Sequence, residues 1–215
     1  MTSPISACST GWSTDPPRLA LAGLRSALAG PFDLTLARGE CVAISGPSGA
    51  GKSLLLRMIA DLDPNQGEVA LDGRARASFS APDWRRHVTY CPAESGWWAP
   101  VVAAHLPPVR RAAWAALAER LGLDPVLLDG PVARLSTGER QRLAISRALV
   151  ATPAVLLADE PTGPLDPDST ARVEALLAER LAAGMALLLV THDTAQATRL
   201  AARRLRLEAG RLVAP

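Results

Sequence analysis

Short apolar runs alternate with longer amphipathic segments along most of this chain. The runs at 41–45, 154–158 and 186–190 are uninterrupted and have the length of strands that are buried on both faces. Segments at 168–181 and 194–202 instead place apolar residues at helical spacing. Strands that alternate with helices in this way predict an α/β fold, in which helices cover both faces of a mostly parallel sheet.

Weaker patterns predict further strands at 19–24, 32–36 and 87–91. The run at 67–73 alternates and ends on the turn-forming pair Asp72-Gly73, so we expect an antiparallel strand at the edge of a sheet. A closing hairpin is predicted at 204–213, around Ala209-Gly210.

The pattern changes at about 94–150, where strand signals are few and Pro107-Pro108 interrupts the chain. Helical spacing follows at 110–121, and its expected core face consists of Ala112, Leu117 and Leu121. We therefore predict a small α-helical subdomain, inserted at about 94–150 in a single domain that spans 18–215.

Composition and charge exclude several classes of protein. The 215 residues suffice for one large domain, and the formal net charge of +2 gives no electrostatic case for a nucleic-acid partner. No apolar run approaches the ~20 residues that span a bilayer, so a role at a membrane requires a partner. Three scattered cysteines fit neither a disulfide framework nor a metal site. Residues 1–17 are rich in Ser, Thr and Pro, lack the features of a signal peptide and are predicted to form a disordered tail.

A glycine-rich segment follows the run at 41–45 and leads into an apolar helix. It fits the pattern G-x-x-x-x-G-K-[ST] between strand and helix, the setting in which successive backbone amides cradle phosphate groups. With the first helical residue beyond it, the segment comprises Gly46, Pro47, Ser48, Gly49, Ala50, Gly51, Lys52, Ser53 and Leu54. We expect Lys52 to reach the β- and γ-phosphates and the Ser53 hydroxyl to bind Mg²⁺.

Lys52 is the only lysine of the chain, whereas all other basic side chains except the histidines are arginines. A compact ammonium has been kept at the one position where a planar guanidinium would fit badly. This composition supports the same interpretation of the loop.

Acidic and imidazole side chains follow two of the predicted buried strands. Asp159 and Glu160 come after the run at 154–158, and His192 comes after the run at 186–190. Ligands of open α/β sheets bind at the carboxyl ends of the strands. We expect Asp159 to hold Mg²⁺ together with Ser53, Glu160 to polarise the attacking water, and His192 to bind the γ-phosphate.

These motifs, in this order, resemble those of ABC ATPases over about 19–213. Besides the phosphate loop and Asp159-Glu160, the resemblance includes the signature at 135–139, which is its most specific element, the pair Leu165-Asp166, and His192. The chain resembles the nucleotide-binding subunit of a bacterial ABC transporter, and the stretch around Tyr90 resembles small metal (iron) exporter ATPases.

The resemblance implies a P-loop NTPase (RecA-like) fold with an antiparallel β edge, MgATP as ligand, and a head-to-tail homodimer or pseudo-dimer. Each ATP would lie between the phosphate loop of one subunit and Ser136 and Gly138 of the other, with Asp166 at the same interface. It also implies an integral membrane permease as partner and a cytoplasmic location on the inner face of the membrane. Alternatives are a soluble ABC ATPase outside transport and a regulatory subunit with weak turnover.

The chain departs from the family pattern at several positions. Ala93 stands where a glutamine is usual; either Glu94 takes its role with a shift of one residue, or the contact is lost. The aromatic residue expected near 24–27 to stack on adenine is missing; either Arg25 stacks instead, or the base is held loosely. Pro164 precedes Leu165-Asp166 where a small residue is usual.

The adjacent residues Trp97 and Trp98 allow two interpretations. They form part of the core of the helical segment, or they form an exposed patch that receives a helix of the permease.

Overall fold

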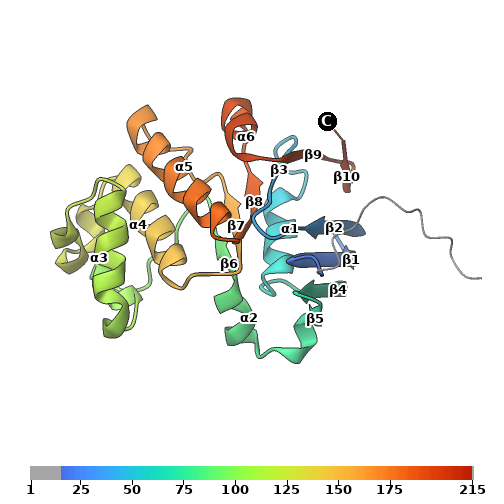
Figure 1. Ribbon diagram of the computed structural model, residues 1–215, viewed down its shortest axis with the longest axis horizontal. Helices are drawn as coiled ribbons and strands as arrows, with labels where there is room; N and C mark the ends of the chain where they lie inside the picture. Colours follow the sequence, from blue (N-terminus) through green and yellow to red (C-terminus); the bar gives the residue numbers. More distant parts are fainter. Residues whose placement is uncertain (1–15, 215) are drawn as a thin grey trace, which may run out of the picture.

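The computed structural model describes residues 16–214, so most of the predicted tail at 1–17 lies outside the described residues. A six-stranded sheet forms the centre of the fold, with the strand order β10-β9-β3-β8-β7-β6 (Figure 1). Its strands are β3 (Cys41–Ser45), β6 (Val88–Cys91), β7 (Val155–Asp159), β8 (Ala186–Val190), β9 (Arg203–Glu208) and β10 (Arg211–Val213). All pairs are parallel except the closing hairpin of β9 and β10, which confirms the predicted sheet and hairpin.

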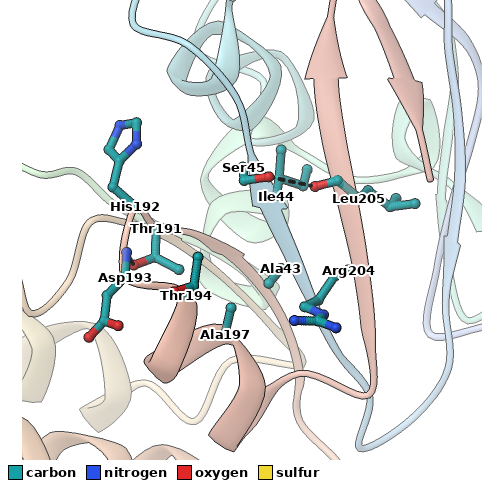
Figure 2. A pocket seen from close by; sticks show the side chains of 10 residues that line it. All are labelled: Ala43, Ile44, Ser45, Thr191, His192, Asp193, Thr194, Ala197, Arg204 and Leu205. Atoms are coloured by element: carbon teal, nitrogen blue, oxygen red, sulfur yellow. Dashed lines mark hydrogen bonds between the residues drawn. The ribbon is translucent and has the colours of Figure 1, made fainter. Parts of the chain in front are cut away.

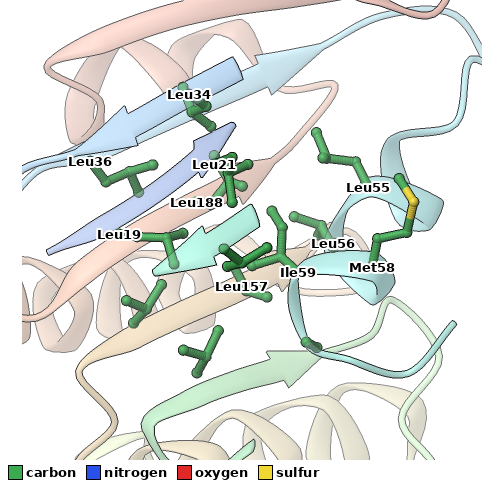
Figure 3. Close-up of a cluster of buried hydrophobic side chains, with 14 of the residues drawn as sticks. Leu19, Leu21, Leu34, Leu36, Leu55, Leu56, Met58, Ile59, Leu157 and Leu188 are labelled. Carbon is green, nitrogen blue, oxygen red and sulfur yellow. The ribbon is translucent and has the colours of Figure 1, made fainter. Parts of the chain in front are cut away.

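Alternation along the central strands buries both faces of this sheet. Leu157 and Leu188 face one apolar cluster, whereas Leu156 and Leu187 face the other. The first cluster receives helix α1 (Lys52–Ile59), whose Leu55, Leu56, Met58 and Ile59 are fully buried (Figure 3). The second cluster receives α4 (Thr137–Val150) and α5 (Pro167–Ala182), while α6 (Thr194–Leu200) packs at its margin. Helices on both faces hold the carboxyl ends of the strands in one fixed array.

A second, antiparallel sheet covers the far side of α1. Its order is β2-β1-β4-β5, with β1 (Leu19–Arg25), β2 (Phe32–Leu36), β4 (Gln66–Leu71) and β5 (Arg74–Ala75). The strand predicted at 67–73 is antiparallel, but its expected place at the edge is wrong. Asp72 and Gly73, with φ values of 47° and 76°, turn the chain back so that β5 pairs beyond β4.

The segment between β6 and α4 is helical, as its pattern predicts. It contains α3 (Arg111–Arg120) and short 3₁₀ turns at Val102–His105, Pro108–Arg110, Pro125–Asp129 and Val132–Arg134, while α2 (Ala81–His87) precedes β6. Leu117 and Leu121 are buried, but Ala112 is exposed, so its place on the core face was wrong. Trp114 takes this place because its large ring lies on the same face and its Nε1–H donates to Ser146 Oγ at 2.8 Å. The subdomain boundaries stay a prediction.

Two further findings bear on the expected setting. Among residues 16–214, no helix combines the length and the apolar character needed to cross a bilayer. Cys41 and Cys91 are buried free thiols, and burial raises the pKa of each to about 12. Both thiols are therefore neutral at pH 7.

Candidate functional site

The loop between β3 and α1 has a backbone that requires glycine. Gly46, Gly49 and Gly51 have φ values of 147°, 78° and 97°. A Cβ atom on residue 46 would lie 2.4 Å from the Leu207 carbonyl oxygen, so even alanine does not fit there. The glycines thus allow the loop to turn tightly from the end of β3 into the first turn of α1, where no acidic residue offsets the positive helix end.

Lys52 lies folded over this loop. Its residue is only 8 % exposed, and Nζ donates to the carbonyl oxygens of Gly46 at 2.8 Å and Pro47 at 3.0 Å. These neutral acceptors hold the ammonium in place, and charged phosphate oxygens would make stronger bonds with it. Ser53, the next residue, is exposed at the start of α1.

Asp159 ends β7 at the same edge of the sheet. Strand β8 lies between β7 and β3, and its Val190 pairs with both Asp159 and Ile44. The Asp159 residue is 4 % exposed, and its Oδ2 accepts a hydrogen bond of 3.2 Å from the Tyr90 hydroxyl. Burial, and next the nearby Asp159 carboxylate, raise the pKa of Tyr90, so this phenol stays a donor at neutral pH.

Tyr90 was missed by the sequence analysis as a site residue. It contacts Asp159 because β6 pairs with β7, and the two residues are 69 positions apart. The available signal was that Tyr90, the only tyrosine, lies in a predicted strand.

The pair Ser53 and Asp159 suits Mg²⁺ in its chemistry. Both offer hard oxygen atoms, and Mg²⁺ in nucleotide sites binds one or two carboxylates besides water and phosphate oxygens. In the described part of the chain, no group of three or more His, Cys, Asp or Glu side chains could hold a metal ion alone. Such a site would depend on the phosphates for its remaining ligands.

Glu160 and His192 lie in contact beyond the ends of β7 and β8. The His192 backbone N–H donates to Glu160 Oε2 at 3.3 Å, and His192 Nε2 lies 3.4 Å from Glu160 Oε1. The second pair is too long and poorly aligned for a good hydrogen bond, which leaves Glu160 Oε1 buried and without a hydrogen-bond partner. Glu160 has a φ of 46°, an uncommon backbone conformation for this residue type.

A cavity of about 330 Å³, lined by His192 but not by Glu160, lies between β3, β9 and α6. Figure 2 shows Ser45 at its wall, where Ser45 Oγ donates to the Leu205 carbonyl oxygen at 3.3 Å. In the same view the imidazole of His192 projects away from Ala197 and Arg204, at the rim.

Ser136, Gly138 and Asp166 form a second group. Ser136 caps α4 in a capping box: its Oγ accepts from the Glu139 backbone N–H at 3.3 Å, and its own backbone N–H donates to Glu139 Oε2 at 2.8 Å. The hydrogen bonds that the Ser136 backbone N–H and hydroxyl donate to the Glu139 carboxylate lower the pKa of Glu139. Asp166 caps α5 by accepting from the Ser169 backbone N–H at 2.9 Å. Within the described residues, no hydrogen bond or salt bridge joins this group to the glycine-rich loop.

The positions that depart from the family pattern lie on the surface. Ala93, Glu94 and Pro164 are exposed, and Arg25 ends β1 with its Nη2 donating to Gln66 Oε1 at 3.1 Å. The roles considered for Glu94 and Arg25 stay predictions.

Comparisons with known proteins agree with this arrangement. The ABC transporter family matches residues 30–163. An aliphatic sulfonates import ATP-binding protein, SsuB 1 of Nocardia farcinica, is 38 % identical over 93 % of this chain and 81 % of its own length. The lipoprotein-releasing system ATP-binding protein LolD of Alcanivorax borkumensis is 39 % identical over 78 % of this chain and 80 % of its own length.

A solved structure is similar over almost the whole fold. It is a dimeric ATP-binding cassette in a post-hydrolysis state bound to ADP and Pi, with a TM-score of 0.79 and 25 % identity, covering 90 % of this chain and 96 % of the other. The finer resemblance to metal exporters stays a prediction, because the two relatives above are named for other cargoes. The chain belongs to the ABC transporter family and is an ATP-binding, ATP-hydrolysing subunit of such a transporter.

Proposed function

We propose that this chain binds MgATP on the loop of residues 46–54, hydrolyses it with Glu160 as the general base, and drives a separate membrane permease. The observation that carries this proposal is the convergence of three features at one edge of the sheet. These are the Lys52 ammonium over its glycine loop, the buried Asp159 carboxylate, and the contact between Glu160 and His192.

Each side chain has a separate task in this proposal. Lys52 exchanges its two carbonyl acceptors for phosphate oxygens, and Ser53 and Asp159 would hold Mg²⁺, which neutralises phosphate charge. Glu160 takes a proton from the attacking water on a carboxylate oxygen. His192, adjacent to that carboxylate, donates a hydrogen bond to the γ-phosphate.

The second phosphate contact would come from another copy of the chain. Ser136 is exposed and Gly138, at the start of α4, is partly exposed, and in the described residues no hydrogen bond or salt bridge joins either to the loop of its own subunit, so both are free to face a partner's ATP. We infer a head-to-tail homodimer, or a pseudo-dimer with a related subunit, that closes on ATP.

A mixing experiment tests this shared site. A Lys52→Ala chain lacks the loop cation, and a Ser136→Arg chain lacks a working signature, so each alone should be inactive. A mixture should regain about a quarter of the activity of the unchanged protein, because half of randomly formed dimers are mixed and each holds one complete site. ATPase activity of the mixture no higher than that of the two variants would contradict the shared site.

Trp98 is a candidate contact for the permease. Its residue is 71 % exposed, which excludes a core role for Trp98, while Trp97 is partly buried. The Arg147 guanidinium lies over both rings, 4.5 and 4.9 Å from their centroids. His105 Nε2 accepts the backbone N–H groups of Trp98 at 2.9 Å and Ala99 at 3.1 Å, so the exposed ring stands on a rigid base. We infer that the permease packs here and holds the subunit at the cytoplasmic face of the membrane.

Replacing Trp98 by Ser should weaken co-purification with the permease by about tenfold or more, as for a tryptophan at the centre of an interface. ATPase activity of the isolated subunit should stay unchanged, because Trp98 lies outside the nucleotide site. Val126→Ser is the matched control, since Val126 is also exposed (63 %). Undiminished co-purification of the Trp98→Ser variant would remove the patch from the proposal.

A further inference from the structure

Two buried glutamines hold the turn that follows Glu160. Gln141 of α4 is 3 % exposed, and its Nε2 donates to the Pro161 carbonyl oxygen at 3.2 Å. Gln196 of α6 is fully buried, and its Nε2 donates to Thr162 Oγ1 at 2.8 Å. The two amides therefore donate hydrogen bonds to neighbouring residues of one turn, each from a different helix.

The amide of Gln196 is oriented by a charge on a third helix. Its Nε2 also donates to Glu174 Oε1 of α5 at 3.3 Å, and Glu174 accepts two further bonds of 2.7 Å from Arg199 of α6. A carboxylate can face only the NH₂ side of an amide, which fixes the Gln196 nitrogen toward Glu174 and Thr162. Helix α6, which begins just after His192, is thus hydrogen-bonded both to α5 and to the turn that follows Glu160.

The turn needs such support because of its backbone. Glu160 has a φ of 46°, and residues in such regions persist only where their surroundings hold them. Its own backbone provides two bonds, from its N–H to the Val190 carbonyl oxygen at 2.9 Å and from the Gly163 N–H to its carbonyl oxygen at 3.2 Å. The two glutamines act on the residues between these bonds, Pro161 and Thr162.

We propose that Gln141 and Gln196 are positioning residues that keep the Glu160 carboxylate aimed beside His192. The proposal rests on the proposed function, in which Glu160 is the base. Gln141 Oε1 also accepts a hydrogen bond from Ser95 Oγ at 3.3 Å, so Gln141 connects the turn to the segment that carries Trp98.

Replacing each glutamine by methionine keeps the size of the side chain and removes its donor. Gln141→Met and Gln196→Met should each lower kcat by about ten- to a hundredfold, the effect of a small misplacement of a reacting group. KM for ATP should change by less than about twofold, because the loop that binds phosphate is untouched. In the double variant Gln141→Met/Gln196→Met, the fold-decrease in kcat should be smaller than the product of the two single decreases, because both residues act through one turn.

Two variants separate positioning from a general loss of stability. Ser146→Ala removes another buried hydrogen bond of α4, to Trp114, and should lower the unfolding temperature without changing kcat. Thr162→Val removes the acceptor and leaves Gln196 in place, and it should reproduce the kcat loss of Gln196→Met. It serves as the test if Gln196→Met does not fold.

Gln196→Glu provides a pH readout. The new carboxyl would face Glu174 and Arg199, with Asp193 3.9 Å from Arg199 and Glu160 beyond Thr162. Protonated, its single O–H can restore one of the two bonds that the amide donates, whereas ionised it only accepts and repels Glu174. The kcat of Gln196→Glu, divided by that of the unchanged protein, should therefore rise as the pH falls. The same kcat ratio for Gln196→Met should not change with pH.

The outcomes distinguish this inference from the function on which it rests. If Glu160→Gln abolishes turnover but both methionine variants keep kcat within about twofold, a change too small for misplacement, the positioning role is wrong and the base assignment stands. A raised KM with unchanged kcat also overturns the positioning role. If Glu160→Gln keeps full turnover, the base assignment itself fails.

Discussion

Glu160→Gln is expected to bind ATP like the unchanged protein and to lose turnover by about a hundredfold or more, the usual range for removal of a general base. The amide keeps the shape of the side chain and its place beside His192, so the nucleotide and the loop at 46–54 are unaffected. It cannot accept the proton of the attacking water. With hydrolysis blocked, the ATP-bound dimer should accumulate.

Three measurements check this result: ATP binding by titration calorimetry, ATPase rate, and mass in solution with ATP. Glu119→Gln is the matched control, because Glu119 is an exposed carboxylate of α3, remote from the sheet edge. Hydrolysis at the normal rate by Glu160→Gln would show that another group activates the water.

Lys52→Ala should lower turnover by about a hundredfold or more, the cost of losing one preorganised donor to developing charge, and should weaken ATP binding. Lys52→Arg should recover little of the loss. The Lys52 side chain is enclosed by the loop, with two carbonyl oxygens within 3.0 Å of Nζ, and a planar guanidinium needs more room.

ATP affinity and ATPase rate of both variants check this prediction. Arg120→Ala is the control, because it removes a cation that pairs with Glu179 on the surface of the helical segment. Activity of Lys52→Arg equal to that of the unchanged protein would mean that position 52 requires only positive charge.

Local sequence signals were enough to predict the part of the fold that carries the phosphate loop. Strand β3, the glycines and α1 follow one another directly, and each has a strong local pattern. The errors arose where local patterns depend on what lies next to them in space. Strand β4 has the alternation of an edge strand but is covered by β5, and the alanine-rich face of α3 gave no sign that Trp114, rather than Ala112, would be buried.

The candidate site was predicted residue by residue but not as a set of contacts. Glu160 and His192 were both identified from the strands that they follow, and their contact depends on the register of β7 and β8. Tyr90 reaches Asp159 only because β6 is the outer neighbour of β7. Gln141 and Gln196 carry no sequence signal, since a buried amide in a helix is recognised only from the turn it contacts.

The position of Lys52 has a practical consequence for chemical labelling. Because Lys52 is the one lysine in the sequence, an amine-acylating reagent can modify a single ε-amine, the one over the glycine loop. Apart from the α-amine, uptake of such a reagent reports directly on the occupancy of this loop. The same chemistry in a cell, such as lysine acetylation, would have one target on this subunit and would neutralise the charge that faces the nucleotide.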